Sequence, residues 1–160
     1  MAVDMFLKID DIKAESSDSA HKGEIDVLSW SWGMSQSGST HTGQGSGAGK
    51  VNVQDISVTK YVDSATPNLI KLCCNGKHFQ KAILTVRKAG ESALEYLKLT
   101  MENGIIASVS TGGSGGEDRL TETVTLNFAK FKAEYTPQGA DGSGGAVVEA
   151  GWDISGNVAV

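Results

Sequence analysis

Apolar and polar residues alternate along several segments of this chain, which is the pattern expected of half-buried β-strands. The first alternating segment runs from Val3 to Ile9, and its strongly apolar side chains share one face. Further strands are predicted over Glu24–Met34, Val51–Val62, Phe79–Lys88, Leu94–Met101, Ile105–Ser110, Leu120–Tyr135 and Val147–Ile154. The pattern therefore predicts a mainly β protein.

Three of these strands change the face that carries their apolar residues partway along. The changes fall at Val27–Leu28, between Val53 and Ile56, and between Phe128 and Ala129. Side chains in a strand alternate with a period of two, so each change requires an extra residue, a bend or burial on both faces. Strands that turn corners in this way are typical of small β-barrels.

One short segment predicts an α-helix. Thr66 is suited to cap it, Pro67 fits the first helical position, and Gly76 is placed to end it. Between the strands, Asn103-Gly104 predicts a two-residue hairpin turn, because both residues tolerate the positive φ angles of such turns. The apolar face of the helix carries Leu69, Leu72 and Cys73.

The longest connection, Ser35–Lys50, is rich in Gly and Ser and contains no large apolar side chain. Structureless loops beyond about 12–15 residues are uncommon in compact domains unless they have a function or are disordered. Ordering such a loop costs backbone entropy that burial within the same domain does not recover. We therefore predict that it is an arm that docks on another subunit. The residues predicted to make the contact are Ser37, Thr40, His41, Thr42, Gln44, Ser46 and Lys50.

Length and charge limit the classes of partner. The 160 residues are predicted to form a single domain over residues 1–160, with a net charge of −5 and no cluster of Lys and Arg that would suit nucleic acid. There is no run of about 20 apolar residues that would span a membrane, and the first residues lack the features of a signal peptide. The only cysteines, Cys73 and Cys74, are adjacent, which favours a reduced, cytosolic folding environment.

Short motifs give little support for catalysis, and we predict no cofactor and no metal. Gly112–Gly116 has the G-x-S-x-G spacing around Ser114, but no histidine follows this serine and the next residues predict a strand rather than a helix. The glycine tract departs from the phosphate-loop pattern at Gln44 and Val51. The three histidines, His21, His41 and His78, have no metal-binding spacing.

Two further groups of residues have alternative interpretations. Trp30 and Trp32 lie on one side of a predicted strand, where packing in the core is favoured over ligand stacking. The cysteine pair is likewise expected to be buried as small apolar groups. A neutral polar face is predicted on the last long strand, either exposed to solvent or forming the wall of an enclosed watery channel. Its residues are Thr121, Thr123, Thr125 and Asn127.

Taken in chain order, several segments resemble the hemolysin-coregulated protein (Hcp) family, the inner-tube proteins of bacterial type VI secretion. The longest matching segment is Val109–Phe128, which contains Ser-Thr-Gly-Gly-Ser-Gly-Gly-Glu-Asp-Arg-Leu-Thr-Glu-Thr. The other matching segments are Met1–Ile9, Glu24–Ser37, Gly49–Leu69, Gly76-Lys77-His78 and Leu84–Gly90.

This resemblance implies a compact β-barrel of two sheets with one short flanking helix and a long protruding Gly/Ser-rich loop. It also implies hexameric rings that stack into a hollow tube, with sheath and spike proteins and small effector proteins as partners. Such a subunit would assemble in the cytoplasm and be secreted by the apparatus itself, without a signal peptide. The arm would contact a neighbouring subunit or ring. Lumen-facing positions would include Ser114, Thr121, Thr123 and Thr125.

Three hypotheses follow, and a native mass distinguishes the first from the other two. The first is a self-assembling structural subunit, which predicts a six-fold assembly with heterologous contacts around the ring. The second is a monomeric barrel that binds a small ligand such as a carbohydrate through Trp30, Trp32 and Trp152. The third is a hydrolase that uses Ser114, in which replacement of that serine would abolish activity.

Overall fold

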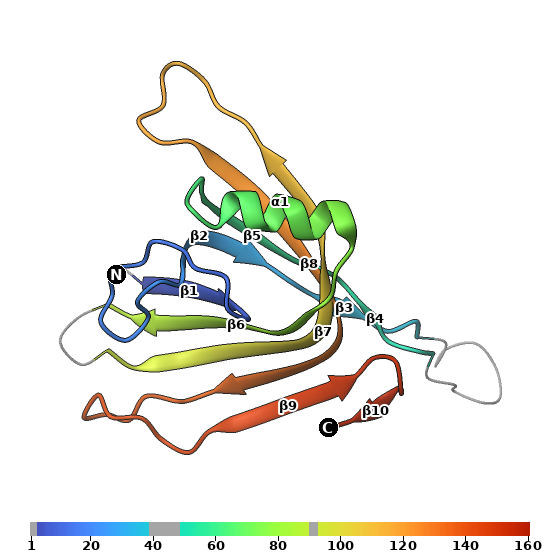
Figure 1. Cartoon of the computed structure of the whole chain (residues 1–160). Helices are drawn as coiled ribbons and strands as arrows, with labels where there is room; N and C mark the ends of the chain where they lie inside the picture. The colour runs from blue at the N-terminus through green and yellow to red at the C-terminus, as the bar shows by residue number, and fades with distance from the viewer. Residues whose placement is uncertain (1–2, 39–48, 90–92) are drawn as a thin grey trace.

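The computed structural model describes residues 3–38, 49–89 and 93–160 as ten strands and one helix. We refer to these elements by the labels in Figure 1. In chain order they are β1 (Val3–Ile9), β2 (Ile25–Ser31), β3 (Met34–Ser35), β4 (Asn52–Val53), β5 (Ile56–Tyr61), α1 (Thr66–Asn75), β6 (Phe79–Lys88), β7 (Glu95–Thr111), β8 (Thr121–Tyr135), β9 (Val148–Asp153) and β10 (Val158–Ala159).

Six of these strands close into a barrel, as the alternating pattern predicts. The main sheet has the order β10-β9-β8-β5-β2-β1-β6-β7, and β7 also pairs with β8, which closes the six strands from β8 to β7 in that order into a barrel. Every pairing is antiparallel. Strands β3 and β4 form a separate two-stranded sheet that leaves the body, while β9 and β10 lie along one side of it (Figure 1).

The predicted corners are present. The ladder between β2 and β5 shifts register between Val27 and Ser29, and β4 ends before β5 begins at Ile56. In β8 the buried side changes after Phe128, and the next buried residue of the strand is Phe131. These breaks let single strands serve two differently oriented parts of the barrel, as β-bulges do in closed sheets.

The predicted hairpin turn at Asn103-Gly104 is wrong, because β7 runs through it without reversing. Asn103 has the expected positive φ of 53°, but the residues on both sides of it pair with the same long partner, β8. Long-range pairing therefore overrides the local turn preference. The only effect of Asn103 is that the residues of β7 that face the core change from odd-numbered to even-numbered positions. A Cβ on Gly104 would lie 2.3 Å from the carbonyl oxygen of Asn127 and from the ring of Phe79.

Helix α1 covers part of the core, and two details of its prediction need correction. Its N-cap is Ala65, with no side-chain cap, so Thr66 is the first helical residue rather than the cap. It ends as predicted at Gly76, which has a φ of 65° and donates its N–H to the Leu72 carbonyl. Of the two cysteines, Cys73 is half-buried against the core and Cys74 is exposed, so only the first packs as expected.

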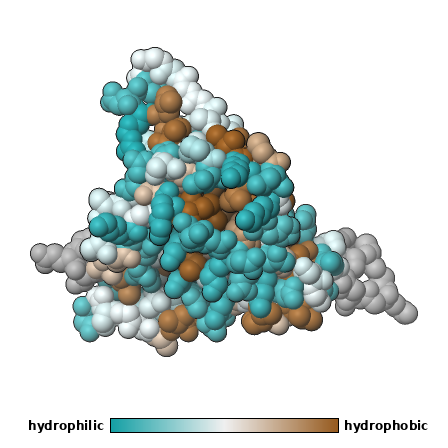
Figure 2. Space-filling model, viewed as in Figure 1, coloured by the Kyte–Doolittle hydropathy of each residue, from teal (hydrophilic) through white to brown (hydrophobic). Residues whose placement is uncertain are grey.

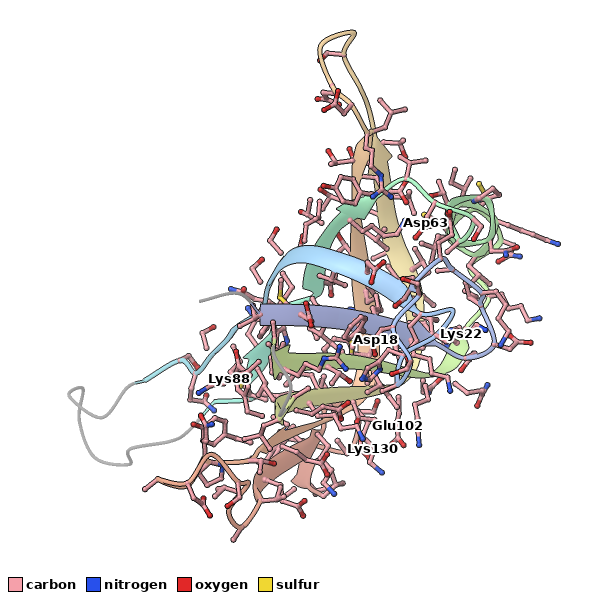
Figure 3. All side chains as sticks on the ribbon, turned by 90° about the vertical axis from the view of Figure 1, so that its left-hand side faces the viewer. Asp18, Lys22, Asp63, Lys88, Glu102 and Lys130 are labelled. Carbon is pink, nitrogen blue, oxygen red and sulfur yellow. The ribbon has the colours of Figure 1, made fainter. Side chains whose placement is uncertain are left out.

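A buried polar cluster joins the helix to the strands beneath it. Lys60 and Glu122 are both fully buried, and the Lys60 Nζ lies 2.5 Å from Glu122 Oε2 and 3.0 Å from Asp63 Oδ1. The Thr66 hydroxyl donates to Glu122 Oε2 at 2.7 Å, and the Thr111 hydroxyl donates to its other oxygen at 3.2 Å. Figure 3 labels Asp63 beside the helix. The cluster thus ties β5, β7, β8 and α1 together.

The loop between β1 and β2 is held against the barrel by charged and aromatic contacts. The His21 ring stacks on Phe6 with the ring centroids 4.4 Å apart, and its two nitrogens contact carboxylate oxygens of Glu24 at 2.9 Å and Glu95 at 2.6 Å. On the same ring of Phe6 lies the Arg87 guanidinium, 5.0 Å from the centroid. The loop is therefore an ordered part of the body.

Beyond the barrel, the ends of β7 and β8 project from the body as a long hairpin (Figure 1). In the same view the surface of the body is largely hydrophilic, with hydrophobic patches near the base of this projection (Figure 2). Within the described residues, no helix is long and apolar enough to cross a membrane.

Candidate assembly surface

The outer face of β2, β5, β8 and β7 is covered by hydroxyl side chains. Residues that are directly paired on neighbouring antiparallel strands point to the same face of the sheet. Residues paired across several successive strands therefore form one row on that face. The first row is Ser31, Ser57, Thr125 and Ser108. The second row is Ser29, Thr59, Thr123 and Ser110.

These rows lie outside because the alternate residues of the same strands fill the core. Val58, Val124 and Leu126 are fully buried, while the hydroxyl residues between them are half-buried or exposed. The Ser108 hydroxyl donates to the Thr125 hydroxyl at 2.7 Å, so neighbouring strands are also joined through the face. We call the eight residues of the two rows the hydroxyl face. It is polar and uncharged, and each side chain both donates and accepts hydrogen bonds.

The four strands that carry the hydroxyl face have two open edges. On one side, β1 pairs with β2 only at Ile25 and Asp26, so Leu28–Ser31 has no strand partner there among the described residues. On the other side, the pairing of β6 with β7 ends at Gly104, which leaves Ile105–Thr111 with β8 as its only described partner. Unpaired edges of this kind are templates for pairing with another chain.

The base of the predicted arm is ordered. Met34 pairs with Val53 and Ser35 with Asn52, and the Gln54 N–H donates to the Gly33 carbonyl at 2.9 Å. Trp32 anchors the base by donating its indole N–H to the Gln54 carbonyl at 2.9 Å. Its ring packs edge-on against Phe131 with the centroids 4.9 Å apart, which confirms its expected place against the core. Trp30 and Trp152 also pack against the core.

Of the predicted arm residues, Ser37 and Lys50 are described, and both are exposed. The remaining arm residues predicted to make contacts lie outside the described residues. They are Thr40, His41, Thr42, Gln44 and Ser46.

The predicted lumen residues fall into two groups. Thr123 and Thr125 are members of the hydroxyl face, and Thr121 lies at its end, opposite Tyr61. Ser114 lies apart from them at the exposed tip of the β7–β8 hairpin, where its carbonyl accepts the Glu117 N–H at 3.2 Å. The sequence therefore indicated one strand of the face and missed the other three.

The residues that were missed also follow a pattern in the sequence, because on each strand two hydroxyl residues are spaced two apart. The pairs are Ser29 and Ser31, Ser57 and Thr59, and Ser108 and Ser110. Each pair alone is unremarkable for an exposed strand. What makes them one surface is the register between strands that are distant in the sequence, which a pattern along the chain does not specify.

The histidines and acidic residues of the described part of the chain are not gathered into a metal site. The two described histidines have other partners, because His21 contacts Glu24 and Glu95, and His78 contacts Asn103 at 2.9 Å. In residues 3–38, 49–89 and 93–160 there is no group of three or more His, Cys, Asp or Glu side chains placed to hold a metal.

The outer face of β6–β9 differs in kind, because it carries charges of both signs. Lys130 lies 3.6 Å from Glu102, and the two are labelled together in Figure 3. Lys132 pairs with Glu134 at 3.4 Å and with Glu149 at 3.1 Å, and hydrogen bonding to Glu149 raises the pKa of Lys132. The molecule thus has one uncharged and one charged outer surface.

Comparison with known proteins agrees with this architecture. Residues 6–135 match the family described as "Type VI secretion system effector, Hcp". The chain is 65% identical over 160 residues to the protein hcp1 of Pseudomonas aeruginosa, covering 99% of both. It is also similar to the crystal structure of Hcp1 from Salmonella typhimurium, with a TM-score of 0.84, 45% identity and full coverage of both chains. A solved type six secretion system protein has a TM-score of 0.93 and 28% identity, with 99% of this chain and 100% of that chain covered.

Proposed function

This chain belongs to the Hcp family of type VI secretion tube proteins, and from that premise we propose that it is a structural subunit of a hexameric ring rather than an enzyme. The rings stack into the inner tube, and small effector proteins are held in their lumen. Sheath and spike proteins of the apparatus are its further partners. The subunit assembles in the cytoplasm and leaves the cell through the apparatus.

The observation that carries this proposal is the hydroxyl face with its two open edges. Strand direction alternates across β2, β5, β8 and β7, because every pairing among them is antiparallel. A second copy related by rotation can therefore place the edge of its β2 antiparallel to the edge of β7 in the first. Repeating the same contact closes a ring, as a heterologous interface does when its rotation closes.

In such a ring the hydroxyl face of every copy would lie on the same side of one continuous sheet. We place it on the inside, where it lines the lumen with uncharged groups. Thr121, Thr123 and Thr125 belong to this lining, in line with what the family resemblance implies. Ser114 would lie at the rim, since it sits at the tip of the projecting hairpin. A lining that donates and accepts hydrogen bonds suits protein cargo that must later be released.

The arm extends this interface. Its base is held against the body by the β3–β4 ladder and by the hydrogen bond of Trp32 to Gln54. Ser37 and Lys50 are the predicted contact residues that lie in the described part of the arm, and both are exposed. We propose that the arm contacts a neighbouring subunit or the next ring.

Native mass spectrometry tests the assembly, and a charge placed on Thr123 tests the lumen. We expect a mass of six copies for the parent protein. In Thr123→Asp and in Thr123→Lys, six like charges would face one another, so both variants should dissociate at low salt and reassemble as salt screens the repulsion. Thr100 on the charged outer face is the matched control, and Thr100→Asp should leave the mass unchanged.

A parent protein that stays a single copy at high concentration would overturn the ring. If the ring forms but neither Thr123 variant weakens it, or if the two charges act in opposite directions, the hydroxyl face does not line the lumen.

A further inference from the structure

We propose that the outer face of β1, β6 and β7 carries a binding site for an acidic segment of a partner protein. The site consists of Lys8, Lys81 and Lys98 around the apolar side chain of Ile83, and we call it the lysine triad. It lies within one copy of the chain, so the proposal does not depend on ring formation.

The strand registers place the triad around Ile83. Lys8 is the direct cross-strand partner of Ile83 on β1. Lys81 precedes Ile83 by two residues on β6 and so shares its face. Lys98 is paired with Thr85, two residues further along β6, which puts it diagonally across from Ile83 on β7. Lys81 and Ile83 point outward because Ala82 and Leu84, which alternate with them on β6, are buried. Lys8 and Lys98 point outward for the same reason, because Leu7, Ile9 and Leu99 beside them are buried.

The surface around Ile83 is hollowed on three sides. A hollow of about 370 Å³ is lined by Lys81, Ile83 and Lys98 together with residues of β7 and β8. Two smaller hollows, of about 120 and 110 Å³, are lined by Lys8 with Lys81 and by Lys8 with Lys98, and Ile83 borders both. A ligand with an apolar side chain over Ile83 could therefore place an acidic group toward each lysine.

The carboxylates that line these hollows already have partners. The Asp10 carboxylate accepts the backbone N–H groups of Gln80 and Lys81, at 2.8 to 3.2 Å. Glu24 and Glu95 contact the ring of His21. Glu102 and Glu134 pair with lysines of β8.

The triad lysines differ from their neighbours in this respect. In the described part of the chain, none of Lys8, Lys81 and Lys98 has an ion pair or a side-chain hydrogen bond. A chain with a net charge of −5 thus presents a local group of three cations that are not engaged in ion pairs. Such a patch complements an acidic surface, and complementarity of this kind sets specificity and association rate.

An acidic protein segment fits this site better than nucleic acid does. The partnered carboxylates of Asp10, Glu24, Glu95 and Glu102 surround the triad and would repel a continuous phosphate backbone. Nucleic-acid sites also use aromatic stacking or an extended basic groove, whereas the centre of this site is the aliphatic Ile83. Separate carboxylates on either side of an apolar side chain match it.

The probe is a synthetic peptide in which glutamates flank a central leucine, titrated into the full-length protein at low salt. The side-chain methyl signal of Ile83 in NMR spectra, which is observable in large assemblies, reports on binding without any substitution. We expect that signal to shift while the methyl signal of Ile70 on α1 does not. A variant with Lys8→Gln, Lys81→Gln and Lys98→Gln should bind the peptide about tenfold more weakly, in line with the loss of several exposed charge contacts.

Matched probes separate this site from a general charge effect. Lys71→Gln on α1 removes one of the exposed lysines away from the site and should leave binding unchanged. A peptide with glutamine in place of glutamate should not bind, and serine in place of the leucine should weaken binding. The proposal is overturned if Lys71→Gln weakens binding as much as the triple variant does. It is also overturned if the neutral peptide binds as well as the acidic one, or if the Ile83 methyl signal does not shift. Tighter binding of a DNA oligonucleotide of equal charge would also overturn it.

Discussion

The Lys60 ammonium lies 2.5 Å from the Glu122 carboxylate, and neither side chain is exposed to solvent. Asp63 contacts the same ammonium at 3.0 Å, so two carboxylates share one cation. A buried charge is tolerated only when it is paired and hydrogen-bonded. This pair therefore fixes the relative positions of β5, β8 and the start of α1, close to the point where the hydroxyl face begins.

Substitutions of Lys60 and of Glu122 should differ in how far they lower the free energy of unfolding. Glu122→Gln leaves Lys60 beside Asp63, so the remaining pair is still neutral. Lys60→Met leaves Glu122 and Asp63 without a cation, and removing one partner of a buried pair typically costs about 3–5 kcal/mol. We expect Lys60→Met to be the more destabilising change, measured as the free energy of unfolding in urea.

The double variant, with Lys60→Met and Glu122→Gln, is the control for this asymmetry. It removes one of the two carboxylates that Lys60→Met leaves without a cation, so it should recover part of the lost stability. Equal costs for the two single variants would show that the cluster is not organised around Lys60.

Asp18 should make the stability of the β1–β2 loop dependent on pH. Its hydrogen bond with Arg87 lowers the pKa of Asp18 below the usual 3.8, and backbone N–H groups of Ala20 and His21 act in the same direction. A carboxyl whose pKa is lowered on folding contributes stability above its unfolded pKa and loses it as the pH falls through the folded value. Asp18→Asn should therefore lower stability at neutral pH.

Urea unfolding at a series of pH values checks this. The difference between the parent and Asp18→Asn should be constant above about pH 5 and shrink as the pH falls below it. Asp26→Asn makes the same change in net charge at an exposed position on β2, and it should cost less at neutral pH. A difference for Asp18→Asn that grows toward acid pH would contradict the assignment.

Alternation alone was enough to predict most of the barrel from the sequence. The bounds of β6 were predicted to the residue, and the three changes of face marked real corners in β2, between β4 and β5, and in β8. These features are local, because the period of two and its interruptions are visible within one strand. The helix end at Gly76 was likewise predicted from its tolerance of positive φ.

The errors occurred where distant parts of the chain decide the outcome. Asn103-Gly104 has the local chemistry of a turn, yet pairing with β8 on both sides of it, and with β6 up to Gly104, keeps β7 one continuous strand. Glu122 occupies an inward position that the pattern left polar and unexplained, and only Lys60 on β5 accounts for it. The hydroxyl face was found on one strand only, since its residues on the other three strands are brought together by the register between strands.

Gly104 should tolerate no side chain. A Cβ there would lie 2.3 Å from the Asn127 carbonyl oxygen, and backbone of the paired strand cannot move away without breaking the ladder. We expect Gly104→Ala to destabilise the fold by about 1–3 kcal/mol, the usual cost of overpacking, in a urea titration. Gly112→Ala at the hairpin, where nothing lies within 4 Å, is the control and should unfold like the parent. A neutral Gly104→Ala would mean that β7 and β8 separate easily at this point.

The open edge of β2 should be the most sensitive place to interrupt the ring. Leu28 is 40% exposed at the start of the edge that β1 leaves unpaired. A lysine on an edge strand opposes pairing with another strand, because its charge would have to be desolvated at the contact. Leu28→Lys should therefore keep the fold of the single copy while lowering the fraction of hexamer in native mass spectra at micromolar concentration.

Ile70→Lys, which changes a similarly exposed apolar residue on α1, is the control and should leave the hexamer intact. If Leu28→Lys assembles as fully as Ile70→Lys, neighbouring copies do not meet along β2, and ring contacts must instead come from the arm.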